Sequence, residues 1–214
     1  MIDPKRKTLI FDFGNVLINL DFPRCFEAFK KTLGQDFSKG LPENTKAFMF
    51  RYEKGEVNTE SFLWHLQQYA PQAEIRDIID AWNAILSELP MSRLHMLTDL
   101  KEEYNVAMLS NINDMHEKKI HHRLESDMGI HNFHEDFFHQ VFYSHKIGYR
   151  KPDPECYAFV QKSLGIEKGG DILFIDDMQD NITAAINYGW QAILHNPQGD
   201  ILLTIEDYLH QAGF

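Results

Sequence analysis

Cysteine is scarce in this sequence of 214 residues, which contains only Cys25 and Cys156. Both lie in segments of helical character and neither belongs to a C-x-x-C pair, so they offer no disulfide framework. Reduced thiols are the default for such a pattern. We therefore expect a cytoplasmic protein.

Long hydrophobic runs are missing too. Residues 1–7 lead directly into the first apolar segment without the apolar region of a signal peptide, and no later stretch approaches membrane-spanning length. The sequence also has no internal repeat and no low-complexity linker. These absences favour a soluble intracellular protein without a membrane partner.

Positive charge is in short supply. The chain carries 21 Lys and Arg residues against 32 Asp and Glu residues, for a formal net charge of −11. Nucleic-acid binding depends on clustered positive side chains, so this balance argues against a DNA or RNA partner. A small phosphate ester is a different kind of ligand, because a few local cations and the N–H groups at helix starts can balance its charge.

Polar residues stand directly after several apolar segments that have the character of buried strands. Asp12 follows residues 8–11 and precedes the turn sequence Phe-Gly-Asn-Val-Leu. Similar segments, at 105–109, 140–143 and 172–175, lead to Ser110 with Asn111, to Lys151, and to Asp176 with Asp177. In open α/β sheets ligands bind beyond the carboxyl ends of the strands, so we expect these side chains to meet at one edge.

These residue types form the set that phosphoryl transfer requires. Asp12 provides a nucleophile, and Ser110 and Lys151 provide a hydroxyl and an ammonium for the phosphoryl oxygens. The pair Asp176 and Asp177 provides carboxylates suited to Mg²⁺. The sequence therefore predicts a phosphoryl-transfer site at this edge.

The whole chain resembles the haloacid dehalogenase superfamily, whose members are mostly phosphatases acting through an aspartyl-phosphate intermediate. By that resemblance Asp12 matches the nucleophile of the first motif, Ser110 the hydroxyl of the second and Lys151 the lysine of the third. Asp177 matches the magnesium ligand of the fourth motif, and Asn181 matches a position that is often Asn. The chain is most similar to the branch reading FD-x-GNV, which includes bacterial α-D-glucose-1-phosphate phosphatases and is related to the amino-terminal phosphatase domain of soluble epoxide hydrolase.

One position departs from the superfamily's usual first motif. Two residues after the nucleophile that motif has a second Asp, which protonates the leaving oxygen, whereas this chain has Gly14. The backbone carbonyl of Gly14 is still able to bind a metal, but the acid is lost. Asp21 is a candidate substitute, with capping of the helix that starts at Phe22 as the alternative role.

The resemblance implies a full set of site residues. The expected catalytic residues are Asp12, Ser110, Asn111 and Lys151, and the expected phosphate-binding residues are Asn15, Ser110, Asn111 and Lys151. The expected Mg²⁺ ligands are Asp12, the Gly14 carbonyl and Asp177. Asp176 and Asn181 are expected to contact these ligands without binding the metal themselves. Mg²⁺ is the expected cofactor.

The chain also divides into two kinds of segment. Apolar residues recur at helical spacing in residues 22–33 and 75–86, whereas strands and helices alternate from Leu94 onward. Helices are expected to begin at Pro154, with Asp153 as the cap, and near Asp180. The prediction is an α/β fold: a doubly wound, Rossmann-like parallel core of residues 1–17 and 91–214, with an all-helical cap of residues 18–90 inserted after the first strand.

Two further groups of residues allow more than one interpretation. The cap aromatics Tyr52, Trp64 and Trp82 either line a substrate pocket or pack the helical insert. Histidines crowd residues 116–145, but neither the His121-His122 pair nor the H-x-x-H pattern of 131–134 has the further ligands that a zinc site needs.

The function that fits best is a Mg²⁺-dependent phosphatase of small phosphorylated metabolites, with sugar phosphates as the leading class and anomeric phosphates favoured. The alternatives are a phosphosugar mutase, a haloacid dehalogenase, and a non-catalytic module that binds a phosphometabolite. The sequence leaves open whether the protein is a monomer or a homodimer.

Overall fold

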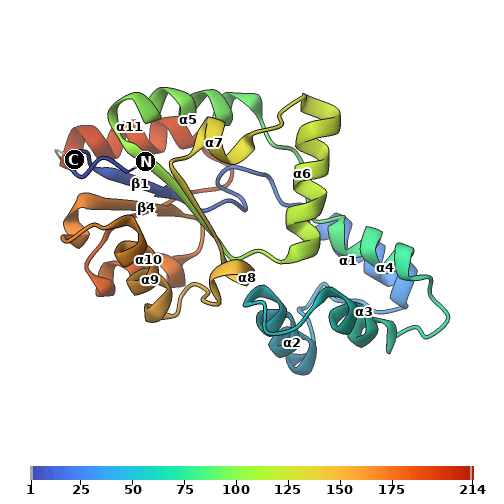
Figure 1. Ribbon diagram of the computed structural model, residues 1–214. Coiled ribbons are helices and arrows are strands. Elements are labelled where there is room, and N and C mark those ends of the chain that lie inside the picture. The colour runs from blue at the N-terminus through green and yellow to red at the C-terminus, as the bar shows by residue number, and fades with distance from the viewer. Residues whose placement is uncertain (1, 213) are drawn as a thin grey trace.

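The computed structural model describes residues 2–212 and 214, and its centre is a parallel β-sheet (Figure 1). The strand order is β3-β2-β1-β4-β5, and every neighbouring pair is parallel. The strands are β1 Thr8–Phe11, β2 Asn105–Ser110, β3 Gln140–Tyr143, β4 Ile172–Asp176 and β5 Gln191–Leu194. The four strands expected from the sequence are confirmed, and β5 adds a partly exposed edge.

Helices cover both faces of this sheet, so its central strands β1, β2 and β4 are buried along their whole length. Side chains that alternate along the strands enter different cores: Leu9 and Phe11 pack on one face, and Ile10 packs on the other. In Figure 1, α5 (Met91–Glu103) and α11 (Ile201–Ala212) lie on one side, and α9 (Pro154–Leu164) and α10 (Gln179–Tyr188) lie on the other. This arrangement confirms the predicted doubly wound α/β core.

Helix boundaries in the core follow the punctuation of the sequence. Helix α9 begins at Pro154 and α10 begins at Gln179, and both end at glycines with positive φ, Gly165 and Gly189. Asp153 occupies the N-cap position, although its side chain makes no capping hydrogen bond. The remaining core elements are α6 Asp114–Met128, α7 Phe133–Phe137, α8 Ser144–Ile147 and the 3₁₀ helix Gly169–Asp171.

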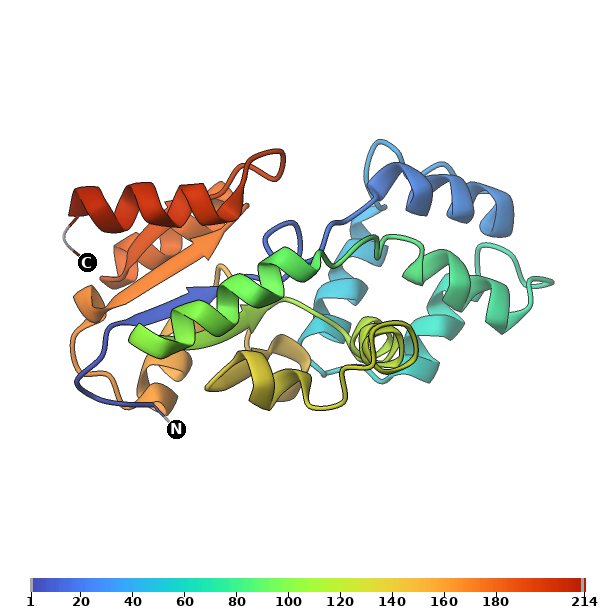
Figure 2. The same ribbon diagram turned by 90° about the horizontal axis from the view of Figure 1, so that it is seen from above.

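Four helices precede α5 and form a separate layer, seen beyond the carboxyl ends of the strands in Figures 1 and 2. They are α1 Phe22–Leu33, α2 Glu43–Glu53, α3 Thr59–Gln67 and α4 Ile75–Asn83. The chain enters and leaves this layer through a short antiparallel bridge between Leu20 and Leu86. The layer has its own apolar cluster, but the assignment of residues 18–90 as a distinct domain stays a prediction.

The cap aromatics differ in their surroundings. Tyr52 and Trp82 are buried in the apolar cluster of the cap, as the packing interpretation expects, and Trp82 also lines a cavity next to the sheet. Trp64 is 63% exposed, so neither role considered for it from the sequence is correct.

Asp21 accepts a hydrogen bond from the backbone N–H of Arg24 at 2.9 Å and so caps α1. None of the helices in the described residues is long and apolar enough to cross a membrane.

Candidate active site at the strand ends

The parallel register brings three carboxylates to one edge of the sheet. Phe11 pairs with Ile175 on β4, so Asp12 and Asp176 follow at the same level, and Asp12 N–H donates to the Ile175 carbonyl at 2.8 Å. Carboxylate oxygens of Asp12, Asp176 and Asp177 lie within 4.8 Å of one another. We call these three residues the strand-end cluster. Its excess negative charge needs compensation by cations.

Lys151 supplies part of that compensation. Its Nζ donates to Asp12 Oδ1 at 2.8 Å, to Asp176 Oδ2 at 2.7 Å and to the Leu109 carbonyl at 2.8 Å, and the residue is only 1% exposed. Burial by itself would lower the pKa of Lys151, but attraction to Asp12 and Asp176 raises it overall. The ammonium therefore stays charged.

Lys151 does not fully compensate the negative charge of Asp12. Burial raises the pKa of Asp12 to about 7, and Lys151 only partly opposes the shift because Asp176 and Asp177 add negative charge nearby. Burial likewise raises the pKa of Asp177. One more cation beside Asp12 and Asp177 would relieve both shifts.

Asp176 has a different role from its neighbour Asp177. Besides the bond from Lys151, it accepts two from Asn181 Nδ2, both at 3.0 Å, and one from the Met178 N–H at 2.8 Å. Both of its oxygens are therefore engaged inside the protein. Asp177 is only partly buried, and its carboxylate accepts from Asn15 Nδ2 at 2.9 Å through one oxygen.

The turn after Asp12 positions two of the expected residues. Asn15 has a φ of 56°, in the left-handed region that Asn tolerates, and its Oδ1 accepts from the Leu20 N–H. The amide of Asn15 thus joins this turn to Asp177. A Cβ at position 14 would lie 2.9 Å from Leu20 Cδ1, so Leu20 fills the space beside Gly14.

Asn111 acts on the backbone of Lys151. Its Nδ2 donates to the Lys151 carbonyl at 2.8 Å, and its Oδ1 accepts from the Lys151 N–H at 2.9 Å. Both polar atoms of the amide are thereby used to hold the loop that carries the lysine. Ser110 is buried at the end of β2, and its hydroxyl has no hydrogen bond within the part of the chain that the structure describes. Ser110 is therefore the freer donor for a ligand.

An ion pair between the cap and the core was not expected from the sequence. Glu53, at the end of α2, accepts from Arg150 at 3.3 Å and 3.1 Å, and the guanidinium stacks on Phe50 with 3.9 Å to the ring centroid. Burial raises the pKa of Glu53 to about 7, with Arg150 opposing the shift. Arg150 directly precedes Lys151, so this pair ties the cap to the loop of the site. Nothing in the sequence marks the pairing of residues so far apart.

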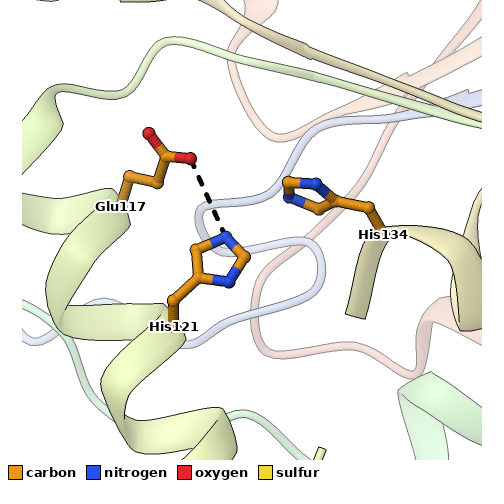
Figure 3. A group of neighbouring side chains, drawn as sticks. All are labelled: Glu117, His121 and His134. Atoms are coloured by element: carbon orange, nitrogen blue, oxygen red, sulfur yellow. Dashed lines mark ion pairs between the residues drawn. The ribbon is translucent and has the colours of Figure 1, made fainter. Parts of the chain in front are cut away.

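A second group of side chains of metal-ligating types lies between α6 and α7 (Figure 3). Glu117, His121 and His134 bring ligand atoms within 4.8 Å of one another, a grouping that the sequence spacing did not indicate. We call it the helix cluster. Glu117 is hydrogen-bonded there by Lys146 and by His145 Nε2, the latter at 2.9 Å, so the Lys146 ammonium already balances its charge. A divalent cation would meet that ammonium at close range.

The fold and the strand-end geometry define a class of protein: a doubly wound α/β protein with a parallel sheet, a carboxylate directly after β1 and a buried lysine beside it. The chain belongs to the haloacid dehalogenase-like hydrolase family, which it matches over residues 6–189. This finding confirms the family and the enzyme class predicted from the sequence. The particular branch of the family stays a prediction.

Three proteins with similar sequences or structures illustrate this family membership. D-ribitol-5-phosphate phosphatase of Bacteroides thetaiotaomicron is 25% identical over 188 residues, which cover 86% of this chain and 89% of that enzyme. Drimenol cyclase drtB of Aspergillus calidoustus is 25% identical over 201 residues, which cover 91% of this chain and 35% of that protein. A HAD family enzyme of B. thetaiotaomicron, solved with magnesium and inorganic phosphate, is 30% identical with a TM-score of 0.77, covering 91% of this chain and 96% of that one.

A further solved structure supports the fold alone. A HAD-like family hydrolase of Porphyromonas gingivalis has a TM-score of 0.81 at 23% identity, covering 95% of this chain and 98% of that one. The similarity over nearly full lengths includes the helical layer as well as the sheet.

Proposed function

We propose that the protein is a magnesium-dependent phosphatase that hydrolyses small phosphorylated metabolites through a phosphoryl group carried on Asp12. The observation that carries this proposal is the placement of Lys151 Nζ between Asp12 and Asp176, 2.8 Å and 2.7 Å away, with Ser110 at the adjacent strand end. A related phosphatase and a related structure holding magnesium and phosphate support the same reaction class.

The residues at the site suit Mg²⁺. The strand-end cluster offers only carboxylate oxygens, the ligands that this hard cation prefers. Asp176 is occupied by Lys151 and Asn181, which leaves Asp12, Asp177 and the Gly14 carbonyl as the proposed ligands. When bound, Mg²⁺ supplies positive charge for the phosphoryl oxygens.

The proposed reaction has two steps. A carboxylate oxygen of Asp12 bonds to phosphorus while the bond from phosphorus to the ester oxygen breaks, and Lys151 and Ser110 donate to the phosphoryl oxygens. The leaving oxygen takes its proton from solvent. Water then cleaves the aspartyl phosphate, releasing inorganic phosphate and restoring the Asp12 carboxylate.

Gly14 limits the substrates that this site handles well. A positioned general acid contributes on the order of 10²–10⁴ in rate, and position 14 cannot supply one. Asp21 is an unsuitable substitute because its carboxylate caps α1. Phosphate esters of acidic hydroxyls should therefore react fastest. The anomeric sugar phosphates predicted from the sequence meet this condition, and so do phenyl phosphates.

A haloacid dehalogenase is the second candidate, since it too attacks through an aspartate and lacks the acid at this position. Three neighbouring carboxylates disfavour it, because they would repel the halide and the substrate carboxylate. A mutase would ordinarily need the missing acid. A binding module without turnover is the remaining alternative.

Hydrolysis of p-nitrophenyl phosphate, measured with Mg²⁺ and with excess EDTA, separates these functions. We expect Mg²⁺-dependent release of phosphate, and mass spectrometry of a rapidly quenched reaction should locate the phosphoryl group on Asp12. Equal activity in EDTA would contradict the metal assignment. No turnover of any phosphate ester would leave the dehalogenase and the binding module, and release of halide from a haloacid would then separate those two.

A further inference from the structure

A cavity of about 330 Å³ extends from the strand-end site into the helical cap. Gly14, Ser110 and Asn111 line it on the side of the sheet. On the side of the cap its wall is apolar and includes Phe22, Phe26, Phe29, Leu41, Met49 and Trp82. Because the same cavity touches the catalytic strand ends, a phosphate ester bound at Asp12 would place its organic group in it.

Most polar side-chain atoms around this cavity are already engaged by the protein; within the described residues the Ser110 hydroxyl and Oε1 of Glu53 are the exceptions. Burial lowers the pKa of His116 to about 4, and both nitrogens of the neutral ring lie within 3.1 Å of partners, Asn113 Nδ2 and the Trp82 carbonyl. Asn111 uses both amide atoms to hold the Lys151 backbone, and Glu53 is paired with Arg150 through Oε2. Few groups remain to bond the hydroxyls of a sugar or polyol.

The gain from burying methylenes and the cost of burying unpaired hydroxyls together determine which kind of organic group binds best in this cavity. Each buried methylene strengthens binding by roughly fourfold. A buried hydroxyl without a partner weakens binding by about tenfold or more. With several hydroxyls per molecule, a polyol phosphate loses far more in this cavity than an alkyl or aryl phosphate.

We propose that the cavity selects phosphate monoesters with an apolar organic group, aliphatic or aromatic, next to the phosphate. The assignment rests on the proposed phosphatase function, since it concerns the same site. Two separate features agree on aryl esters in particular: the apolar wall favours an aromatic ring, and Gly14 favours an acidic leaving hydroxyl.

The preference of the cavity for an apolar group can be tested with two substrates whose leaving groups are of similar acidity. Hexyl phosphate and D-ribitol-5-phosphate are both esters of primary alcohols, and the polyol is the slightly better leaving group. We expect kcat/KM for hexyl phosphate to be at least about tenfold higher. An equal or higher value for D-ribitol-5-phosphate would overturn the proposal.

Binding of phosphonates in the presence of Mg²⁺ tests the same wall without turnover. Hexylphosphonate should bind at least about tenfold more tightly than methylphosphonate by isothermal titration calorimetry. Equal affinities would overturn the apolar assignment. If p-nitrophenyl phosphate is not hydrolysed while hexylphosphonate is still preferred, the phosphatase proposal fails and the cavity assignment stands.

Two variants test whether the apolar lining of the cavity causes the preference for hexylphosphonate. Met49→Gln keeps the length of a partly buried lining side chain but adds an amide, and it should reduce the advantage of hexylphosphonate severalfold. Methylphosphonate affinity should stay unchanged, which also shows that the fold is intact. Trp64→Gln is the control, because Trp64 is exposed and does not line the cavity. An undiminished hexyl preference in Met49→Gln would contradict the proposal.

Discussion

The strand-end cluster and the helix cluster are both compact, but they differ in the balance of charge. In both, three potential metal ligands approach within 4.8 Å. The strand-end cluster has three carboxylates beside one buried ammonium, that of Lys151. The helix cluster has a single carboxylate, Glu117, beside Lys146 and His145. Distance alone therefore does not identify a metal site, whereas the uncompensated charge does.

The pKa shifts express the same contrast. In the strand-end cluster burial raises the pKa of Asp12 to about 7, so the charged form lacks sufficient partners. In the helix cluster burial alone would raise the pKa of Glu117, but bonds from His145 and Lys146 outweigh it and lower the value to about 2. A divalent cation would stabilise the first site and would compete with the Lys146 ammonium in the second.

The largest expected effect is that of Asp12→Asn. The variant keeps the shape of the side chain but removes the nucleophile, so phosphatase activity should fall by at least about three orders of magnitude. The measurement is kcat/KM for p-nitrophenyl phosphate, with the melting curve as control. Full activity together with an unchanged melting curve would exclude the covalent mechanism.

The comparison of the two clusters is tested most directly by Asp177→Ala and Glu117→Gln. Loss of a proposed Mg²⁺ ligand should reduce activity about 10²-fold or more and abolish its increase with Mg²⁺ concentration. Glu117→Gln changes the other cluster by the same unit of charge and should leave the Mg²⁺ dependence unchanged. A loss of Mg²⁺ activation in Glu117→Gln would show that the charge argument has chosen the wrong cluster.

The residues of the strand-end cluster could be predicted from sequence for a physical reason. Buried parallel strands have a fixed register, so residues that directly follow them meet at one edge. Asp12 and Asp176, 164 positions apart in the chain, were accordingly expected together and lie within 4.8 Å. Each of the two strand ends is marked by its own apolar segment, so it can be recognised from the sequence around it.

The features that were missed depend on packing between elements. Glu53 and Arg150 are 97 positions apart and meet only because α2 packs near α8. His134 joins Glu117 and His121 from a different helix, so the H-x-x-H spacing gave no indication of the group. Trp64 was misjudged because helical periodicity does not show which face of a short helix is covered.

A smaller effect is expected from Asn111→Ala. The substitution removes both hydrogen bonds to the Lys151 backbone and leaves every charge of the strand-end cluster in place. Because the lysine would be held less firmly, kcat should fall about 10- to 100-fold. The dependence on Mg²⁺ should persist, which distinguishes positioning of Lys151 from metal binding. A loss of Mg²⁺ activation would contradict this role.

The smallest effect on activity, and a clear effect on stability, is expected for Glu117→Gln as a function of pH. The folded-state pKa of Glu117, about 2, lies below the ordinary value of 4.5, so its contribution to stability is present above the ordinary value. It is lost as the pH falls towards the folded-state pKa. At pH 7 the variant should be less stable by on the order of 2 kcal/mol, a figure reduced for the screening of the half-exposed Lys146.

Urea unfolding of both proteins between pH 7 and pH 3 measures this difference. The gap in unfolding free energy should stay constant from pH 7 to about pH 5 and shrink below it, because only the wild type then gains a proton on unfolding at this position. A gap that does not change with pH would mean that Glu117 is not the compensated carboxylate inferred from its bonds to His145 and Lys146. The helix cluster would then lose the feature that sets it apart from the strand-end cluster.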